Sequence, residues 1–166
     1  MNGYLFLTCF GTVWLVLGCF VAPLGRKLRW VPLSLLVIIA IALIYRGFTP
    51  NAYSTSAGGA AAWARIKGPF IAINVAQYFA IFLIVALAIR KNRRDLIYPL
   101  ISATVGIHFL ALAPIFTFPA YYLTGGLILC ADGVSFIIGI SYRRAFVCLV
   151  TGIILWGTAL LTLGRL

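Results

Sequence analysis

The sequence predicts an all-α integral membrane protein, a bundle of six transmembrane helices. Apolar side chains make up 64% of the 166 residues and charged side chains only 9%, whereas average globular chains are about 25% charged. Apolar runs of roughly 20 residues, long enough to cross a bilayer as helices, recur along the chain. The longest polar stretch, residues 47–66, leaves no room for a soluble domain. We therefore expect residues 1–166 to form one membrane domain.

The first three predicted spans cover about residues 3–23, 30–46 and 68–89. Signal peptides carry basic residues ahead of their apolar stretch, and none precedes the first span, so we expect this helix to be retained. In the connection between the second and third spans, residues 47–66, the Gly, Ser, Thr, Pro and Asn residues indicate that its first part is irregular. The following AAAWAR indicates a short helical lead-in, with Trp63 at the level of the lipid headgroups.

The last three predicted spans cover about residues 96–113, 120–140 and 145–163. The basic loop RKNRRD, residues 90–95, precedes the first of them. The uncharged PIFTFP, residues 114–119, predicts a tight turn. Arg143 and Arg144 then mark a second basic loop before the final span.

The basic residues predict how the bundle is oriented. With six spans, the loops at 24–30, 90–95 and 141–144 share one side of the membrane and hold nine Lys or Arg residues, against four on the other side. The positive-inside rule then places these loops in the cytoplasm and both termini outside it. The net charge of +11 is explained by topology and by contacts with anionic membrane lipids, so we expect no nucleic-acid partner.

Several polar residues lie within or beside the apolar runs, where an unpaired polar group costs free energy and an ionisable one suggests a functional site. Asn74 and Gln77 share one helical face. His108 is the only histidine, and Asp132 is one of two acidic residues. With Arg46, Lys67, Tyr121 and Tyr122 they could line one outward-facing pocket, with Asp132 deeper towards the cytoplasm. Each also has a structural interpretation, as an interhelical hydrogen bond, an aromatic belt or a snorkelling cation.

The cysteines do not predict a metal centre. Cys9, Cys19, Cys130 and Cys148 all lie in apolar runs, form no CxxC motif and are accompanied by a single histidine. They are best explained as small buried hydrophobes. We expect neither a metal nor another cofactor.

Three short motifs resemble a family of uncharacterised bacterial multi-spanning membrane proteins. Its N-x-x-Q pattern falls on Asn74 and Gln77. Two further patterns, G-x-H-F-x-x-L-A and P-x-Y-Y-x-T-G, fall within residues 106–113 and 119–125, whereas Ala111 stands where members often carry Pro. The resemblance covers about a third of the chain and implies a bacterial inner-membrane location. It implies no activity.

Three classes of function fit these features. The first is a small transporter or channel for an anionic or amphipathic solute, expected to act as a homo-oligomer because the chain is short. The second is a membrane protein that binds a ligand or partner without moving it, such as a sensor, accessory or immunity protein. The third, an intramembrane enzyme, is less well supported because His108 and Asp132 are expected at different depths and no second carboxylate accompanies them in the apolar runs. No catalytic residue is therefore assigned.

Overall fold

The structure, a computed structural model, describes residues 3–23, 30–47 and 57–163 and is helical throughout, with no strand in these ranges. Its helices are, in order, α1 (Gly3–Val21), α2 (Trp30–Gly47), α3 (Ala57–Arg90), α4 (Ile97–Phe116), α5 (Ala120–Ser135) and α6 (Ile140–Leu163), with a short 3₁₀ turn, η2 (Arg94–Leu96), before α4. Three helical stretches in the described part are long and apolar enough to cross a membrane, namely 64–90, 94–116 and 142–162. These features define an all-helical protein of membrane character.

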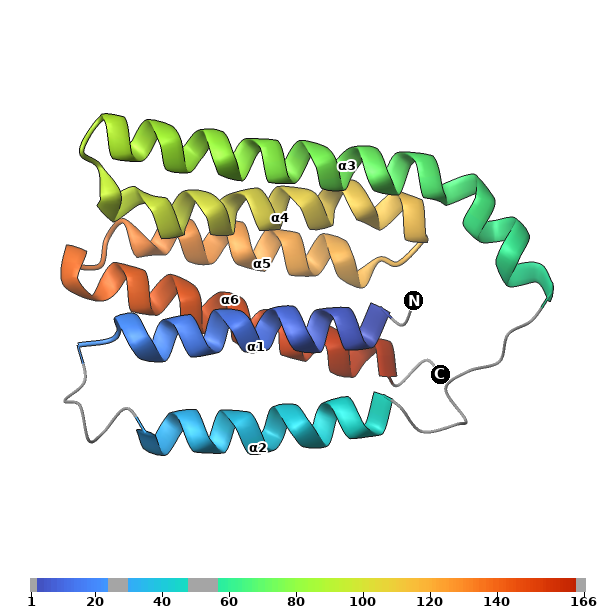
Figure 1. Ribbon diagram of the computed structural model, residues 1–166, viewed down its shortest axis with the longest axis horizontal. Coiled ribbons are helices and arrows are strands. Elements are labelled where there is room, and N and C mark those ends of the chain that lie inside the picture. The colour runs from blue at the N-terminus through green and yellow to red at the C-terminus, as the bar shows by residue number, and fades with distance from the viewer. Residues whose placement is uncertain (1–2, 24–29, 48–56, 164–166) are drawn as a thin grey trace.

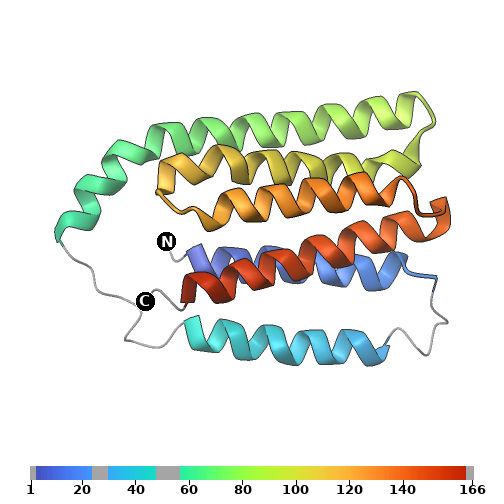
Figure 2. The same cartoon turned by 180° about the vertical axis from the view of Figure 1, so that it is seen from behind.

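The helices run roughly parallel or antiparallel to one another and pack mainly against their neighbours in a row (Figures 1 and 2). The row reads α3, α4, α5, α6, α1, α2, with α4 also touching α6. The most extensive contact joins α1 to α6, so the first and last helices of the described chain pack side by side, with α2 on the outer side of α1. In the other half, α3 packs mainly on α4 and leaves most of its surface exposed.

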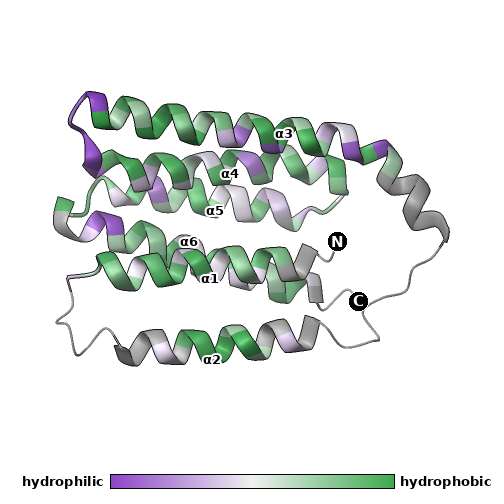
Figure 3. Cartoon of the chain, viewed as in Figure 1, coloured by the Kyte–Doolittle hydropathy of each residue, from purple (hydrophilic) through white to green (hydrophobic). Residues whose placement is uncertain are grey.

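The ends of the helices follow the alternation that the sequence predicts. α1 begins and α6 ends at the end of the bundle where the turn between α4 and α5 lies (Figure 1). The α3–α4 and α5–α6 connections lie at the opposite end, where hydrophilic residues gather, while the sides of the helices are mostly hydrophobic (Figure 3). There the Arg143 guanidinium of α6 lies 3.8 Å from the Asp95 carboxylate of η2, so the start of α6 contacts the α3–α4 connection.

Glycines allow two helix pairs to approach closely. A Cβ atom built on Gly125 of α5 would lie 2.6 Å from the Gly106 carbonyl oxygen of α4. One built on Gly152 of α6 would lie 2.5 Å from Leu15 Cγ and 2.9 Å from the Gly11 carbonyl oxygen of α1. Small residues at helix contacts are the usual way for backbones to approach in membranes. Both pairs therefore require glycine at the crossing.

Hydroxyl groups link further pairs of helices. The Thr124 and Thr158 hydroxyls lie 2.6 Å apart and join α5 to α6. The Trp156 indole N–H donates to the Thr8 carbonyl at 3.3 Å and to the Thr12 hydroxyl at 3.2 Å, joining α6 to α1. Such bonds satisfy polar groups that would otherwise lie unpaired in an apolar interior.

Some helix boundaries differ from those of the predicted spans. α3 begins at Ala57, so the lead-in before the third span is one continuous helix with it. α5 ends at Ser135 and α6 begins at Ile140, so Arg143 lies in the first turn of α6 and not in a loop. Its guanidinium donates to the Ser135 and Phe136 carbonyls and lies over the Phe136 ring. A cation at these C-terminal carbonyls stabilises the end of α5 there.

Candidate functional site

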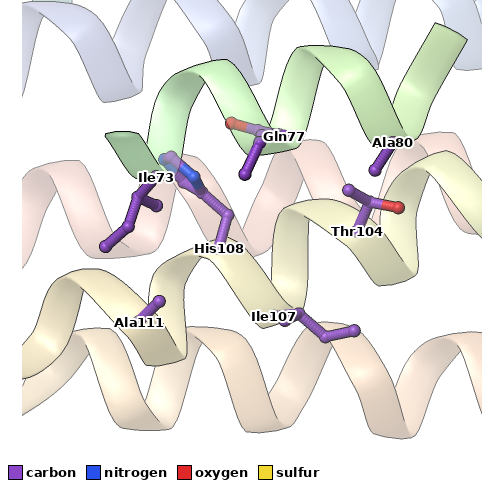
Figure 4. A pocket seen from close by; sticks show the side chains of 8 residues that line it. Ile73, Gln77, Ala80, Thr104, Ile107, His108 and Ala111 are labelled. Atoms are coloured by element: carbon purple, nitrogen blue, oxygen red, sulfur yellow. The ribbon is translucent and has the colours of Figure 1, made fainter. Parts of the chain in front are cut away.

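A hollow of about 330 Å³ lies between α3 and α4. We call it the α3–α4 groove, and its lining residues are Ile73, Ala76, Gln77, Ala80, Thr104, Ile107, His108 and Ala111 (Figure 4). These positions recur every three or four residues, so each helix presents one face. Three of them are alanine, whose short side chains leave space between two helices that otherwise pack together. The groove is thus a consequence of small residues on the facing sides of both helices.

A second hollow, of about 180 Å³, borders the first and reaches α1. Its lining residues are Phe6 and Phe10 of α1, Asn74, Gln77, Tyr78 and Ile81 of α3, and Val105, His108 and Phe109 of α4. Gln77 and His108 line both hollows. The structure therefore brings Asn74, Gln77 and His108, which the sequence singles out, to one place in the bundle.

The hydrogen bonding of these polar groups differs from one residue to the next. The Asn74 amide donates to the Phe70 carbonyl of its own helix at 2.7 Å, and the Thr104 hydroxyl donates to the Leu100 carbonyl at 2.8 Å. Nδ1 of the buried His108 has no hydrogen-bond partner within the described chain. Its imidazole projects from α4 towards α3 (Figure 4).

Gln77 makes no hydrogen bond to any other described residue, so the groove holds an amide and an imidazole with free bonding capacity. An unbonded polar group in an apolar environment costs on the order of 1–3 kcal/mol. A ligand that supplied the missing partners would recover part of this free energy. Gln77 and His108 are thus the polar centre of the candidate site.

Asp132 does not line either hollow. It is buried near the C-terminal end of α5, where the Ser102 hydroxyl of α4 lies beside its carboxyl group and the Cys148 thiol of α6 is near enough to interact electrostatically. Ser102 is hydrogen-bonded to Thr151 of α6 at 2.7 Å. We call Asp132, Ser102, Cys148 and Thr151 the Asp132 cluster. The sequence alone did not indicate that the last three residues belong to a site, because Ser, Thr and Cys are common in apolar helices.

The two tyrosines also lie away from the α3–α4 groove. Tyr121 is buried, and its ring meets Phe109, Phe116 and Phe118 edge-on at centroid distances of 5.3, 6.1 and 4.9 Å. Tyr122 points outward and is exposed. Tyr121 therefore packs in an aromatic cluster, whereas Tyr122 lies on the protein surface. Only Tyr122 is in keeping with the aromatic-belt interpretation.

Lys67, one of the two basic residues expected at the rim, does not border the groove. Lys67 is exposed on α3, seven residues before Asn74 and so about 10 Å from it along the helix. Arg46 belongs to the last turn of α2, but its side chain lies outside the described ones. Among the described residues, no three His, Cys, Asp or Glu side chains come together as metal ligands. The groove therefore has mostly apolar walls, and His108 is the one ionisable residue among its described lining residues.

Comparisons with known proteins do not extend this description. No protein-family model matches the chain, and no curated protein sequence or solved structure is significantly similar to it. The class that the fold defines is that of helical membrane proteins. The resemblance to a bacterial membrane family, carried by the motifs around Asn74, His108 and Tyr121, stays a prediction.

Proposed function

We propose that this protein is a small multi-pass membrane protein that binds an amphipathic solute in the α3–α4 groove and moves it through the membrane. One observation supports the proposal above all: Gln77 and His108 line a mostly apolar hollow and have unused hydrogen-bonding capacity, whereas the Thr104 hydroxyl there is bonded to Leu100. Ligand sites typically combine apolar walls with a few convergent polar groups. The hollow of about 330 Å³ is at the small end of such sites.

The chemistry of the lining defines the class of solute. The Gln77 amide donates and accepts hydrogen bonds, and the His108 imidazole does both when neutral and only donates when protonated. Together they fit a carboxyl or hydroxyl head. Ile73, Ile107 and the alanines fit a short hydrocarbon portion. Because Lys67 does not border the groove, an amphipathic solute is favoured over a small inorganic anion.

The proposed setting is a bacterial inner membrane, crossed six times, with the basic end of the bundle in the cytoplasm. The alternation of helix ends and the gathering of Arg and Lys around residues 90–95 support this orientation (Figure 3). α5 has 16 residues and so a length of about 24 Å, shorter than a typical hydrocarbon core of about 30 Å. Local thinning of the bilayer or association of copies would accommodate it, in keeping with a homo-oligomer.

A second candidate function is binding without transport, as in a sensor or accessory protein. The groove is formed by two neighbouring helices, and α3 makes its main contacts with α4 alone. A solute could therefore occupy the groove from the side of the bilayer without any opening of the bundle. Flux of the identified solute into vesicles separates this function from transport.

Native mass spectrometry of the protein released from mild detergent tests the site. The wild type is compared with Gln77→Leu, which removes the free amide at similar volume, and with His108→Ala. The matched control is Asn74→Leu, because the Asn74 amide is already bonded to its own helix. We expect one co-purified small molecule that is retained in the wild type and control and lost in the two groove variants. Equal occupancy in all four proteins, or a bare wild type, would refute the site.

A further inference from the structure

The Asp132 carboxyl group is buried without a neutralising partner. The residue is 4% exposed, and neither carboxyl oxygen has a hydrogen-bond partner among the described residues. An ionised carboxylate in such surroundings is unfavourable unless a cation or a proton accompanies it. The buried carboxyl group therefore requires either a bound proton or a cation beside it.

No basic side chain of the described chain fills this role. Arg143 lies in the first turn of α6, but its guanidinium donates to the Ser135 and Phe136 carbonyls and contacts Asp95. Two groups on neighbouring helices lie near the Asp132 carboxyl, the Ser102 hydroxyl of α4 and the Cys148 thiol of α6, and neither is a cation. Thr151 of α6 adds a second hydroxyl, 2.7 Å from that of Ser102.

The ligand atoms of the cluster favour a proton over a metal cation. Asp132 lies three residues before the end of α5, about 4.5 Å along the axis. The α3–α4 and α5–α6 connections lie at that end, and the residues in or beside them include Arg90, Lys91, Arg93, Arg94, Arg143 and Arg144. The positive surface potential there opposes the approach of every cation, including the proton, so the available ligand atoms decide between a proton and a metal ion. One carboxyl and two hydroxyls also provide fewer oxygens than the six to eight that Ca²⁺ takes.

We propose that the Asp132 cluster is a proton-binding site, in which the Asp132 carboxyl takes up and releases one proton from the basic end of the bundle. The protonated carboxyl donates a hydrogen bond to the neighbouring Ser102 hydroxyl, and the Ser102–Thr151 pair extends the chain of hydroxyls from α4 to α6. Release of the proton leaves a buried charge among α4, α5 and α6. The contacts of these three helices are then expected to loosen.

This site is separate from the α3–α4 groove, so proton binding does not depend on the proposed function. Ser102 and His108 are both carried by α4, six residues or about 9 Å apart along its axis. If the protein moves a solute, a change at Asp132 is positioned to reach the groove through that helix. Only this coupling rests on the proposed function.

The small number of acidic residues makes a direct test possible. The chain contains two, Asp95 and Asp132, so aspartate labelled with ¹³C at the side-chain carboxyl gives two signals in solid-state NMR of the protein in lipid bilayers. Asp95→Asn leaves one signal, which belongs to Asp132 even if Asp132→Asn fails to fold. We expect this signal to shift from the protonated to the ionised position as the pH is raised across the range where the protein stays folded.

Two outcomes would overturn the proposal. The Asp132 signal could stay in a single protonation state over that whole range, which would show that no proton is exchanged. It could instead shift with Na⁺ at constant pH while K⁺ at equal ionic strength leaves it unchanged, which would make the site a sodium site. Flux measurements are not needed for either conclusion, so failure here is distinguishable from failure of the proposed transport.

Discussion

Replacing Gly125 by alanine tests the close crossing of α4 and α5. The added Cβ would lie 2.6 Å from the Gly106 carbonyl oxygen and 2.8 Å from Leu110 Cγ and Cδ2. Leu110 has alternative rotamers, but the carbonyl oxygen belongs to the backbone of α4 and cannot move away by itself. The two helices must separate, and overpacking of this kind costs about 1–3 kcal/mol.

The neighbouring glycine is the matched control. A Cβ atom on Gly126 would meet nothing within 4 Å. Both substitutions remove a helical glycine and so gain a similar backbone contribution of about 0.5–1 kcal/mol. The difference between Gly125→Ala and Gly126→Ala therefore isolates the crossing, and at about 2–4 °C per kcal/mol for a chain of this size it corresponds to about 2–12 °C in Tm.

Thermal unfolding in one mild detergent, followed by circular dichroism, measures this difference. Gly106→Ala provides an intermediate case, because its Cβ would lie 3.0 Å from Leu129 Cγ and 3.1 Å from the Gly125 carbonyl oxygen. We expect the order of Tm values to be Gly126→Ala highest, then Gly106→Ala, then Gly125→Ala. Equal stability of the Gly125 and Gly126 variants would show that α4 and α5 do not approach as closely as described.

Two further predictions use pairs of variants in the same way. Gly152→Ala should lower the Tm more than Gly157→Ala, because the first Cβ would meet α1 at 2.5 Å and the second nothing within 4 Å; thermal unfolding checks this, and equal values would contradict the α1–α6 crossing. Arg143→Ala should destabilise the protein by about 1–2 kcal/mol through loss of charged hydrogen bonds at the end of α5. Arg144→Ala, at an exposed position, should change little, and equal free energies of unfolding in denaturant for the two variants would exclude the capping role.

The polar residues show how far sequence reasoning reaches. The spacing of Asn74 and Gln77 places them on one helical face, and the structure adds that this face meets His108. The sequence does not reveal that the Asn74 amide donates a hydrogen bond to its own helix, while the Gln77 amide makes no hydrogen bond to another described residue. That difference depends on side-chain geometry within the third helix and on what α4 places opposite it.

For Asp132 and Tyr121 the position in the structure differs from the one that the sequence predicts. Both residues lie within the predicted span 120–140, and the sequence groups them with the pocket. The structure places Asp132 in the contact of α4, α5 and α6 and Tyr121 among phenylalanine rings. Their directions around the α5 axis, relative to α4 and α6, decide this, and periodicity within α5 alone does not specify which neighbour each face meets.

The sequence by itself determined that the chain is helical and of membrane character, because long apolar runs and few charges leave no other way to satisfy the backbone in lipid. It also predicted that successive helices run in opposite directions, since each apolar run is expected to cross the membrane. Only the tertiary structure decided which helices are neighbours, because apolar helices offer many equivalent faces. Glycine crossings and hydroxyl pairs between segments distant in sequence select among them, and the groove and the buried carboxyl exist only in that arrangement.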